Sequence, residues 1–411
     1  MNAMDTILVV NAGSSSVKFQ DFETDGKSSL KRIIKGQVDG IGARPHLRAK
    51  AADDTVLIDE SYRSDVVPDV ASAIRTAGAW LRTEQRLNLI AVGHRVVHGG
   101  PEFSQPVLVD AEIVDKLERY VPLAPLHQPN NLAPIRALLT HNPNLPQVAC
   151  FDTAFHRGHS AAADHFAIPQ RFYKEGVRRY GFHGLSYEFI SRRMQRVFPQ
   201  EANSRAIVAH LGSGASMCAL SNGRSVESTM GFTALDGLPM GTRPGQIDPG
   251  VVLFLISERG MNAKDLLRFL YNDCGLKGLS GISNDVRVLE ASKEAGAALA
   301  LEYFVYRVGL CAGMLAAALG GLDTFVFTAG IGENSPTMRA RIAEKLTWLG
   351  AELDPAANAA SAAIISRPSS RVKLLVIPTD EELMIAEHTL AVVTAGKRKS
   401  ERDVRVEANA R

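Results

Sequence analysis

Two arginine residues lie in loops whose composition is unusual for a surface arginine. Arg95 lies in the segment GHRVVHGG, and Arg243 lies in the glycine- and proline-rich segment GLPMGTRPG. A guanidinium group presents a planar fork of donors that matches the oxygens of a carboxylate or a phosphate. Glycine lets the backbone approach a ligand closely. This composition favours binding of small anions, with a solvated or ion-paired surface arginine as the alternative.

Three glycine- or serine-rich segments, each after an apolar run, have the composition of phosphate-binding loops. They are residues 11–16 (NAGSSS) with Lys18 just beyond, residues 210–214 (HLGSG) and residues 330–334 (GIGEN). Backbone N–H groups in such turns and at helix N-termini can bind phosphate oxygens. One such segment is often a plain turn, whereas three in one chain favour a nucleotide. Neither the P-loop signature nor G-x-G-x-x-G occurs in the sequence.

Two acidic segments and one histidine complete the set of candidate groups. Asp152 directly follows the apolar residues 148–151, so it should lie at the carboxyl end of a strand, where ligands bind in α/β sheets. Residues 379–382 (TDEE) also follow a strand and open a helix, where carboxylates can simply complement the helix dipole. His183 is flanked by glycines in YGFHG, which favours a functional role over a structural one.

Two histidine pairs have spacings that suggest a metal site, namely His94 with His98 and His156 with His159. A zinc site needs further ligands, and no histidine or cysteine lies at a suitable spacing from either pair. We therefore predict structural roles for these four histidines. The four cysteines also lack metal-ligand or redox spacing, which is typical of a reducing compartment.

The elements that must position these groups alternate between strands and helices. Residues 7–10 and 17–22 have the pattern of a hairpin around the first loop, and residues 206–209 and 215–220 repeat that plan around the second. This order predicts α/β layers in two related lobes, as a duplicated chain would give. Further strands are predicted at 89–97, 148–151, 324–328 and 374–377, a turn at 330–332, and helices at 295–319 and from Asp248, Asn262, Ser335 and Glu381.

Bulk properties narrow the class of protein. The chain has 411 residues, enough for two domains, and a net charge of only +2, which gives no case for nucleic acid or an anionic membrane. The longest uncharged apolar run, residues 308–322, has 15 residues, short of the ~20 that span a bilayer, which predicts a buried core helix. No signal-peptide pattern precedes the first strand. We expect a cytoplasmic protein whose partners are small molecules.

Together and in order, these segments resemble the acetate kinase family, which belongs to the superfamily of sugar kinases, hsp70 and actin. The resemblance covers nearly the whole chain. The matching segments are VVNAGSSSVK, GHRVVHGG, LAPLHQPN, FDTAFH, YGFHG, HLGSGAS, GTRPGQIDPG, SNDVR, TAGIGENS and IPTDEELMIA.

The resemblance implies a fold, an activity and partners. The fold would be α/β, of the ribonuclease H-like actin/hsp70/sugar-kinase type, with the active site in the cleft between two related lobes. The first lobe would comprise residues 1–151 and 384–411, on the carboxylate and magnesium side, and the second residues 152–383, on the nucleotide side. The activity would be reversible in-line transfer of the ATP γ-phosphoryl group to acetate, giving acetyl phosphate and ADP. Mg²⁺ would be the cofactor, with Mn²⁺ as a substitute, and a homodimer the assembly.

The resemblance also assigns roles to matching positions. Asp152, His183 and Arg243 match catalytic positions, and Asn11 and Glu381 match the magnesium-binding positions. Arg95 matches the carboxylate-binding arginine, with Val97, Leu126, Phe182 and Pro239 around the substrate methyl group. The nucleotide-binding positions are matched by Lys18, His210, Leu211, Gly212, Ser213, Gly214, Asp285, Val286, Arg287, Gly330, Ile331, Gly332, Glu333 and Asn334.

Acetate is already ionised at neutral pH, so the implied reaction needs no general base. We therefore expect Asp152 to order the magnesium shell and the arginines rather than to abstract a proton. His183 and Arg243 would neutralise charge on the transferred group, since phosphoryl transfer leaves the protein mostly with positioning and charge stabilisation.

The sequence departs from the family pattern at four positions, none of which carries a catalytic charge. Ser213 and Asp380 stand where asparagine is usual, and Pro244 and Gln246 replace serine and aspartate. Propionate and butyrate kinases remain alternatives within the reaction class. A non-catalytic ATP-binding switch, like actin or hsp70, is the alternative from another class, and the intact catalytic set argues against it.

Overall fold

The chain forms two compact units, each built on its own β-sheet. The computed structural model describes residues 4–409 apart from 14, 15, 84 and 86. Unit 1 comprises Met1–Ala154 and Asp380–Arg411, and unit 2 comprises Phe155–Thr379. The lobe boundaries expected from the resemblance put Asp152 and Glu381 in the second lobe, whereas the packing places both residues in unit 1.

Unit 1 contains an eight-stranded sheet with the order β5-β4-β3-β2-β1-β6-β8-β7. β1 to β5 pair antiparallel in succession, whereas β6 runs parallel to both β1 and β8. The strands are β1 (Asp5–Ala12), β2 (Val17–Thr24), β3 (Leu30–Asp39), β4 (His46–Ala51), β5 (Val56–Ser61), β6 (Asn88–Val96), β7 (Val107–Leu108) and β8 (Gln147–Phe151). The helices are α1 (Val70–Thr83), α2 (Ala111–Glu118), α3 (Gln128–His141) and α16 (Glu381–Asn409), with a 3₁₀ turn at Val121–Leu123.

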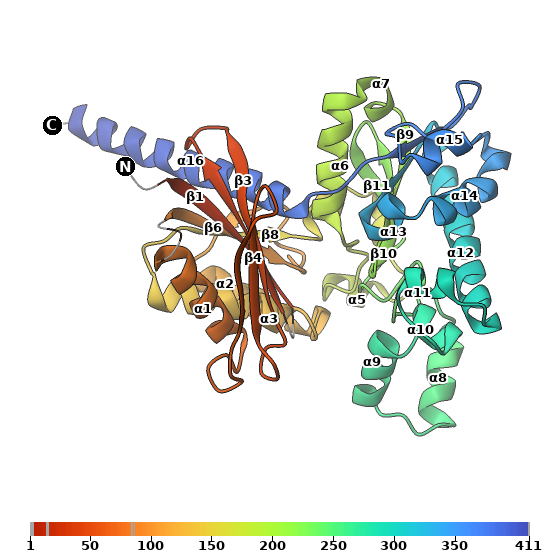
Figure 1. The fold of residues 1–411 in the computed structure, drawn as a ribbon, viewed down its shortest axis with the longest axis horizontal. Helices are drawn as coiled ribbons and strands as arrows, with labels where there is room; N and C mark the ends of the chain where they lie inside the picture. Colours follow the sequence, from red (N-terminus) through yellow and green to blue (C-terminus); the bar gives the residue numbers. More distant parts are fainter. Residues whose placement is uncertain (1–3, 14–15, 84, 86, 410–411) are drawn as a thin grey trace. The chain divides into compact units, whose positions relative to one another are not determined.

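Helices cover both faces of this sheet (Figure 1). α1 and α3 lie on one face, where Trp80 packs into the core that includes Val10 and Phe19. α16 lies against β6, β1 and β8. It comes so close to β6 that a Cβ atom on Gly93 would sit 2.3 Å from Oγ1 of Thr389. The strand ends are therefore held rigidly from both sides.

Unit 2 contains a five-stranded sheet with the order β11-β10-β9-β12-β13. β9, β10 and β11 pair antiparallel, and β9, β12 and β13 run parallel. β3, β2, β1, β6 and β8 of unit 1 have the same order and directions, so the two related lobes that the hairpins predict are confirmed. The strands are β9 (Arg205–Leu211), β10 (Ala215–Ser221), β11 (Arg224–Ser228), β12 (Thr324–Thr328) and β13 (Lys373–Val376).

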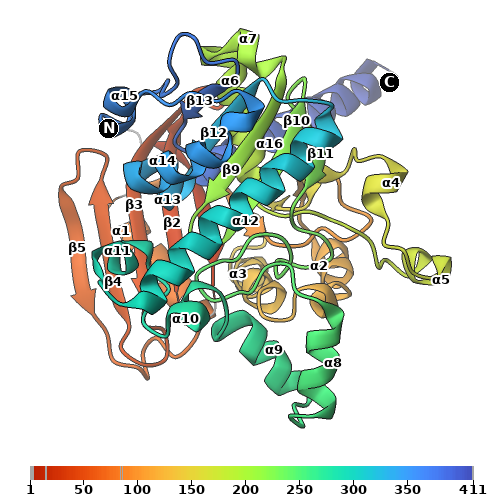
Figure 2. The same ribbon diagram turned by 90° about the vertical axis from the view of Figure 1, so that its right-hand side faces the viewer.

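Helices cover this sheet on both faces as well. α6 packs on the face that presents Val208 and Val326, and α12 packs on β9, β10 and β11 from the other side (Figures 1 and 2). The helices are α4 (Ala161–Asp164), α5 (Gln170–Lys174), α6 (Gly184–Val197), α7 (Pro199–Ala202), α8 (Pro249–Ser257), α9 (Ala263–Asn272), α10 (Gly275–Ser280), α11 (Val286–Ala291), α12 (Ala295–Leu319), α13 (Ala329–Asn334), α14 (Pro336–Lys345) and α15 (Pro355–Ala359), with 3₁₀ turns at Ala154–His156 and Thr347–Leu349.

Most of the predicted helix starts are confirmed, and one predicted turn is wrong. Asp248, Asn262 and Ser335 each cap a helix with a side-chain oxygen. Residues 330–332 form part of helix α13 instead of a turn, because the change of direction after β12 is made at Ala329, whose φ is +63°.

The predicted core helix, α12, buries only one of its faces. By length and composition it could cross a membrane, yet residues such as Phe304, Val308 and Leu315 are buried against the rest of unit 2. Its other face exposes Leu299, Tyr306, Leu310 and Met314.

Candidate functional site

Parallel strands of unit 1 bring three candidate residues to one edge of the sheet. Asn11 lies near the end of β1, Arg95 near the end of β6, and Asp152 directly after β8. The carboxyl ends of parallel strands meet at the same sheet edge, which is where ligands bind in α/β folds. The strand register confirms the alignment, because Arg95 is paired with Cys150, two residues before Asp152.

Arg95 and Asp152 form a two-pronged ion pair at this edge. Nη2 of Arg95 donates to Oδ2 of Asp152 at 2.6 Å, and Nε donates to Oδ1 at 3.1 Å. The Asp152 side chain is 2% exposed and that of Arg95 is 22% exposed. Burial acts to lower the pKa of Arg95, but Asp152 and Glu381 together raise it, so the guanidinium is always charged. Its Nη1 group makes no hydrogen bond to the part of the chain that the structure describes.

Glu381 opens helix α16 and faces the same pair. Its Oε2 lies 3.8 Å from Nε of Arg95. Burial raises the pKa of Glu381 to about 7, and the carboxylates of Asp152 and Glu382 raise it as well, whereas Arg95 and Lys18 act in the opposite direction. The edge therefore carries more carboxylate charge than its one arginine neutralises, which is the condition that attracts a further cation.

The neighbouring Asp380 caps the N-terminus of α16. Its Oδ1 accepts the backbone N–H of Leu383 at 3.0 Å, and its Oδ2 accepts from Nη2 of Arg32 on β3. Arg32 also donates to Gln20 and lies over the ring of Phe22. Asp380, which replaces the usual asparagine, thus faces Arg32 and not the Arg95–Asp152 pair.

One buried residue that the sequence analysis did not select ties two of these strand ends together. Asn131 on α3 donates from Nδ2 to the carbonyl of Ala12 at 2.8 Å and accepts the N–H of Val97 at Oδ1, at 2.9 Å. It therefore fixes the spacing between the end of β1 and the end of β6. The only sequence signal for it was its place beside the LAPLHQPN segment.

Unit 2 brings His183, Arg243 and the loop after β9 together. A Cβ atom on Gly214 would lie 2.7 Å from Nη2 of Arg243 and 3.2 Å from Nε2 of His183. The two side chains therefore point at the same glycine, and a larger residue there would have to displace the end of the Arg243 side chain. Arg243 is anchored by a 2.7 Å hydrogen bond from Nη1 to the carbonyl of Ala234.

His183 is held in an uncommon backbone conformation just before helix α6. Its φ is +56°, in the left-handed region that non-glycine residues rarely adopt. Its Nδ1 lies 2.8 Å from Oγ of Ser216, which in turn contacts the hydroxyl of Tyr187. The His183 ring stacks on that of His210, with centroids 4.3 Å apart.

A cavity of about 470 Å³ lies beside these groups in unit 2. Such a volume suits a small-molecule ligand. Residues from three of the predicted nucleotide segments, 210–214, 285–287 and 330–334, line it, so sequence regions far apart in the chain meet there. The lining comprises Gly212, Ser213, Asn284, Asp285, Val286, Arg287, Glu290, Gly330, Ile331, Asn334 and Ser335.

Several predicted nucleotide residues do not line this cavity. Gly332 lies within α13 and faces the backbone of Phe327 on β12, and Leu211 is buried in β9. Glu333 turns its carboxylate inward, where Oε1 accepts the N–H of Ala329 at 2.7 Å and that of Thr379 at 3.1 Å. Asn284, Glu290 and Ser335 line the cavity although the sequence analysis did not select them. Their position becomes apparent only when α11 and the start of α14 are placed together, as the hydrogen bond from Ser335 to Glu290 shows.

The residues expected around a substrate methyl group are distributed over both units. Val97 and Leu126 belong to unit 1, and Phe182 and Pro239 belong to unit 2. Val97 and Phe182 are buried, whereas Leu126 is 38% exposed. In the first glycine–serine loop, Ser14 and Ser15 lie outside the described residues. Asn11 and Lys18 face each other across the β1–β2 hairpin, and Lys18 is exposed.

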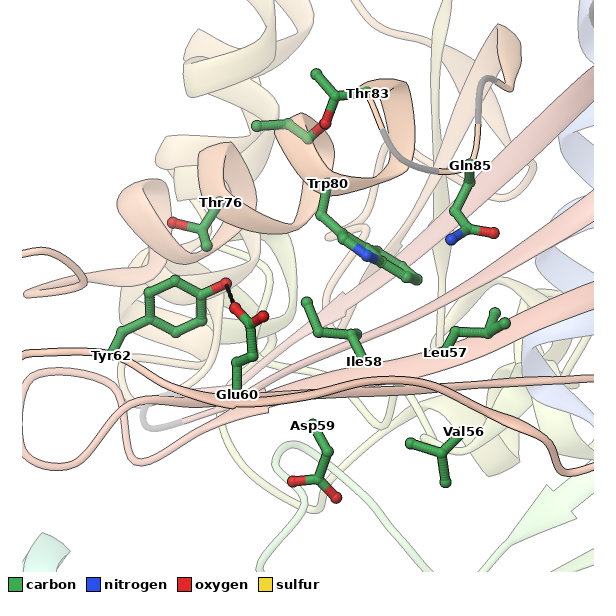
Figure 3. Close-up of a pocket in the computed structure, with 11 residues that line it drawn as sticks. Val56, Leu57, Ile58, Asp59, Glu60, Tyr62, Thr76, Trp80, Thr83 and Gln85 are labelled. Carbon is green, nitrogen blue, oxygen red and sulfur yellow. Dashed lines mark hydrogen bonds between the residues drawn. The ribbon is translucent and has the colours of Figure 1, made fainter.

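A second hollow, a groove of about 830 Å³, lies between β5 and α1 (Figure 3). Ile58 and Trp80 form part of its walls, and Tyr62 donates a hydrogen bond to Glu60 within it. None of the candidate residues lines this groove, so it is separate from the candidate site.

A sequence model of the acetokinase family matches residues 6–387. An acetate kinase from Nitrobacter hamburgensis is 66% identical over 98% of this chain and 100% of its own length. An acetate kinase from Rhizobium meliloti is 61% identical, over 95% of this chain and 99% of its own.

Two solved structures show the same fold. The acetate kinase of Porphyromonas gingivalis superposes with a TM-score of 0.85 at 35% identity, covering 95% of this chain and all of its own. A propionate kinase from Francisella tularensis gives 0.88 at the same identity and coverage.

Proposed function

The chain belongs to the acetokinase family, and on that premise we propose that it catalyses the reversible transfer of the γ-phosphoryl group from ATP to acetate, giving acetyl phosphate and ADP. The observation that carries the proposal is the convergence of Arg243 and His183 on Gly214, beside the cavity of unit 2. Donors fixed at that place can neutralise the charge that spreads over the oxygens of a transferred phosphoryl group. The reaction belongs in the cytoplasm, where ATP is supplied.

The carboxylate substrate is assigned to the Arg95 edge of unit 1. Arg95 keeps its Nη1 group for the acetate carboxylate, while Asp152 fixes the plane of the guanidinium through the other two nitrogens. Acetate is the nucleophile and is already ionised at neutral pH. Asp152 therefore acts by orienting Arg95, and no proton has to be abstracted before in-line displacement.

Magnesium fits the donor set at the same edge. The carboxylates of Glu381 and Asp152 and the amide of Asn11 offer oxygen atoms of the kind that Mg²⁺ prefers. Burial, together with the carboxylates of Asp152 and Glu382, raises the pKa of Glu381, so a bound cation would favour its ionised form. We assign Asn11 and Glu381 to the metal, with Asp152 ordering its water shell. Mg²⁺ would neutralise the phosphate oxygens of ATP, and Mn²⁺, with the same ligand preference, would substitute for it.

The nucleotide is assigned to the cavity of unit 2. Backbone groups of Gly212, Ser213 and Gly330 would contact the phosphates, and Asp285 to Arg287 would contact the nucleoside. His210, Gly214 and Lys18 are assigned to the phosphate end, whereas Leu211, Gly332 and Glu333 would act by shaping the loops.

Acetate is proposed as the preferred acid, with propionate as the second candidate. The set of Val97, Leu126, Phe182 and Pro239 is small and apolar, so it suits one methyl group. One added methylene changes binding by only about 1–3 kcal/mol, so propionate should still react. The exposure of Leu126 and the similarity to a propionate kinase are the observations that favour this second candidate.

A homodimer is the proposed assembly. α8 contains no buried residue although Val251, Leu253, Phe254 and Ile256 lie in it, and α12 exposes a further apolar face. Exposed apolar side chains gathered on two helices in this way are typical of a protein–protein interface.

The decisive experiment traps acyl phosphate with hydroxylamine in the presence of ATP and Mg²⁺, across formate, acetate, propionate and butyrate. The proposal expects the highest kcat/KM for acetate, a lower value for propionate and a poor one for butyrate. Equal kcat/KM for acetate and butyrate would contradict the assignment of the acid. Nucleotide binding without any acyl phosphate would identify a nucleotide-dependent switch instead.

A further inference from the structure

A buried histidine that none of the assigned roles uses lies directly behind the His183 loop. His156 is 1% exposed and belongs to the segment FDTAFH. Its Nδ1 lies 2.8 Å from Oγ of Ser225, and its Nε2 lies 2.9 Å from the carbonyl oxygen of Phe182. His159 approaches the same Ser225 hydroxyl through Nε2, at 2.7 Å. Within the described chain, no group of three histidine, cysteine or acidic side chains could hold a metal, so this cluster has a different role.

The partners of His156 determine where its proton lies. The carbonyl of Phe182 can only accept, so Nε2 of His156 must carry the hydrogen. Burial lowers the pKa of His156 to about 3, so the ring is neutral and Nδ1 is an acceptor. The Ser225 hydroxyl therefore donates to Nδ1 of His156, and its oxygen accepts the Nε2–H of His159. The donor of each of these three hydrogen bonds is therefore fixed: His159 donates to Ser225, Ser225 donates to His156, and His156 donates to the Phe182 carbonyl.

The His156 ring also explains a glycine in YGFHG. Gly181 has φ +74°, and a Cβ atom on it would lie 2.6 Å from Cδ2 and Cγ of His156. The ring thus packs directly on the Gly181 backbone on one side and binds the next carbonyl, that of Phe182, on the other.

The residue after that carbonyl is His183, whose left-handed backbone needs external support. A non-glycine residue rarely adopts this region because the conformation is sterically unfavourable, so the surrounding structure must hold it there. The Phe182 carbonyl belongs to the peptide group that precedes Cα of His183 and about which φ of His183 is defined. A hydrogen bond that fixes this carbonyl therefore also fixes the direction in which the His183 side chain leaves the backbone.

We propose that His156 is a positioning residue for His183: by donating from Nε2 to the Phe182 carbonyl, it holds the left-handed turn that aims His183 at Gly214 and Arg243. The inference rests on the proposed function, because it assigns to His156 a part in stabilising the transferred phosphoryl group. It also gives the FDTAFH histidine a role separate from that of Asp152 in the same segment.

Two substitutions of similar size separate the two ring nitrogens. The amide of glutamine reaches the position of Nε2 and can still donate to Phe182, whereas the shorter asparagine reaches only the position of Nδ1 and keeps the Ser225 contact alone. His156→Asn should lower kcat by about 10- to 100-fold, because small misplacements of a catalytic group have effects of this size. KM for acetate and for ATP should stay within about twofold. His156→Gln should recover most of the lost kcat.

Two further measurements show whether His156 acts through His183. In a His183→Ala background, His156→Asn should lower kcat no further, since coupled residues are not additive. His141→Asn and His141→Gln are the matched controls, because His141 is exposed on α3 and its ring bonds only the carbonyl of Ala137 within the described chain, and both should match the wild type.

Equal kcat values for His156→Asn and His156→Gln, an effect on KM alone, or full additivity with His183→Ala would each overturn the inference.

If His156→Asn does not fold, as judged by thermal unfolding, the variant Ser225→Ala tests the proposal instead. It removes the hydroxyl that orients the His156 ring through Nδ1 and so aims its Nε2–H at the Phe182 carbonyl. The kcat should therefore fall with unchanged KM, and an unchanged kcat would refute the proposal. A wild-type protein that makes no acyl phosphate would contradict the proposed function itself, which is a distinct result.

Discussion

Arg95 and Arg243 have different surroundings, which implies different tasks. Arg95 lies at a sheet edge rich in carboxylates, and Asp152 holds its guanidinium group in a fixed orientation. This arrangement suits a group that binds acetate before the reaction. Arg243 points with His183 at Gly214. Arg95→Ala should raise KM for acetate more than tenfold, whereas Arg243→Ala should lower kcat by about 10²–10³-fold with little change in KM. Steady-state kinetics of the two variants check this. The same KM-only defect in both would contradict the division.

Glu381 and Asp380 are adjacent carboxylates with different partners. Glu381 faces Arg95, whereas Asp380 caps α16 and pairs with Arg32. Glu381→Gln should raise the Mg²⁺ concentration needed for half-maximal activity by more than tenfold and lower kcat. Asp380→Asn keeps the cap and should leave both values within a few-fold. Magnesium titrations at fixed ATP distinguish the variants, and a large defect in Asp380→Asn with a mild one in Glu381→Gln would reverse the assignment.

Asp21 on β2 is a fully buried carboxylate, and neither of its oxygens has a hydrogen bond of normal geometry within the described chain. Burial raises its pKa to about 7 from 3.8, an effect that the nearby Thr6 hydroxyl only partly opposes. The folded state therefore binds the proton more tightly than the unfolded state. Stability is lost as pH rises from about 4 to 7 and stays lower above that range, by roughly 4 kcal/mol.

Asp21→Asn should accordingly raise the melting temperature at pH 8 and have much less effect near pH 4.5. Asp25 on the β2–β3 turn supplies a control of opposite sign, because three backbone N–H groups lower its pKa to about 2. Its contribution is present above the unfolded pKa and lost as pH falls. Calorimetry at pH 8 and 4.5 measures the Asp21 trend, and calorimetry between about pH 4 and 2 measures the Asp25 trend. A pH-independent effect of Asp21→Asn would refute this account.

The charged residues at strand ends could be predicted from sequence because a strand that ends in Arg or Asp places it at a defined edge. Arg95 and Asp152 are examples. Asn131, Arg32 and His156 could not, because their roles depend on partners far away in the chain, such as Ala12, Asp380 and Ser225. The sequence around a single polar residue does not indicate which distant residue will be its hydrogen-bond partner.

At the level of elements, the junction of β12 with α13 depends on one carboxylate. Glu333 accepts the N–H groups of Ala329 and Thr379, and it therefore ties the start of α13 to the segment after β13. Glu333→Ala should loosen this junction and raise the Kd for ADP by about tenfold, measured by calorimetry. Glu344→Ala, at an exposed position of α14, is the control and should not change the Kd. Unchanged ADP binding in Glu333→Ala would show that the junction does not shape the nucleotide site.

The hairpins, the parallel strands and most helix caps could be read from periodicity and from N-cap residues, since both are local signals. α13 could not, because GIGEN reads as a glycine turn. The structure makes the turn one residue earlier, at Ala329, a residue type that gives no hint of a positive φ. The exposed face of α12 could not be predicted either. Apolar residues lie on all sides of this helix, so no periodicity in its sequence separates the buried face from the exposed one.

For the molecule as a whole, the apolar faces of α8 and α12 predict self-association. Light scattering after size-exclusion chromatography should give about twice the 44.4 kDa chain mass. Leu310→Glu combined with Leu253→Glu should shift the protein toward the monomer, because charges would then be buried in the interface. Val66→Glu, at another exposed apolar position, is the matched control and should leave the dimer intact. A wild-type monomer at micromolar concentration would contradict the proposal.

Unit 1 is made of the first and the last parts of the chain, while unit 2 is one uninterrupted stretch between them. On the ribosome, the sheet of unit 1 is therefore synthesised long before α16, the helix that covers β6 and supplies Glu381. Unit 2 can complete its fold during this interval, since domains fold as units when their sequence has emerged. The carboxylate that we propose for Mg²⁺ is thus made together with α16, so a chain released before α16 lacks both the cover of its first sheet and this residue.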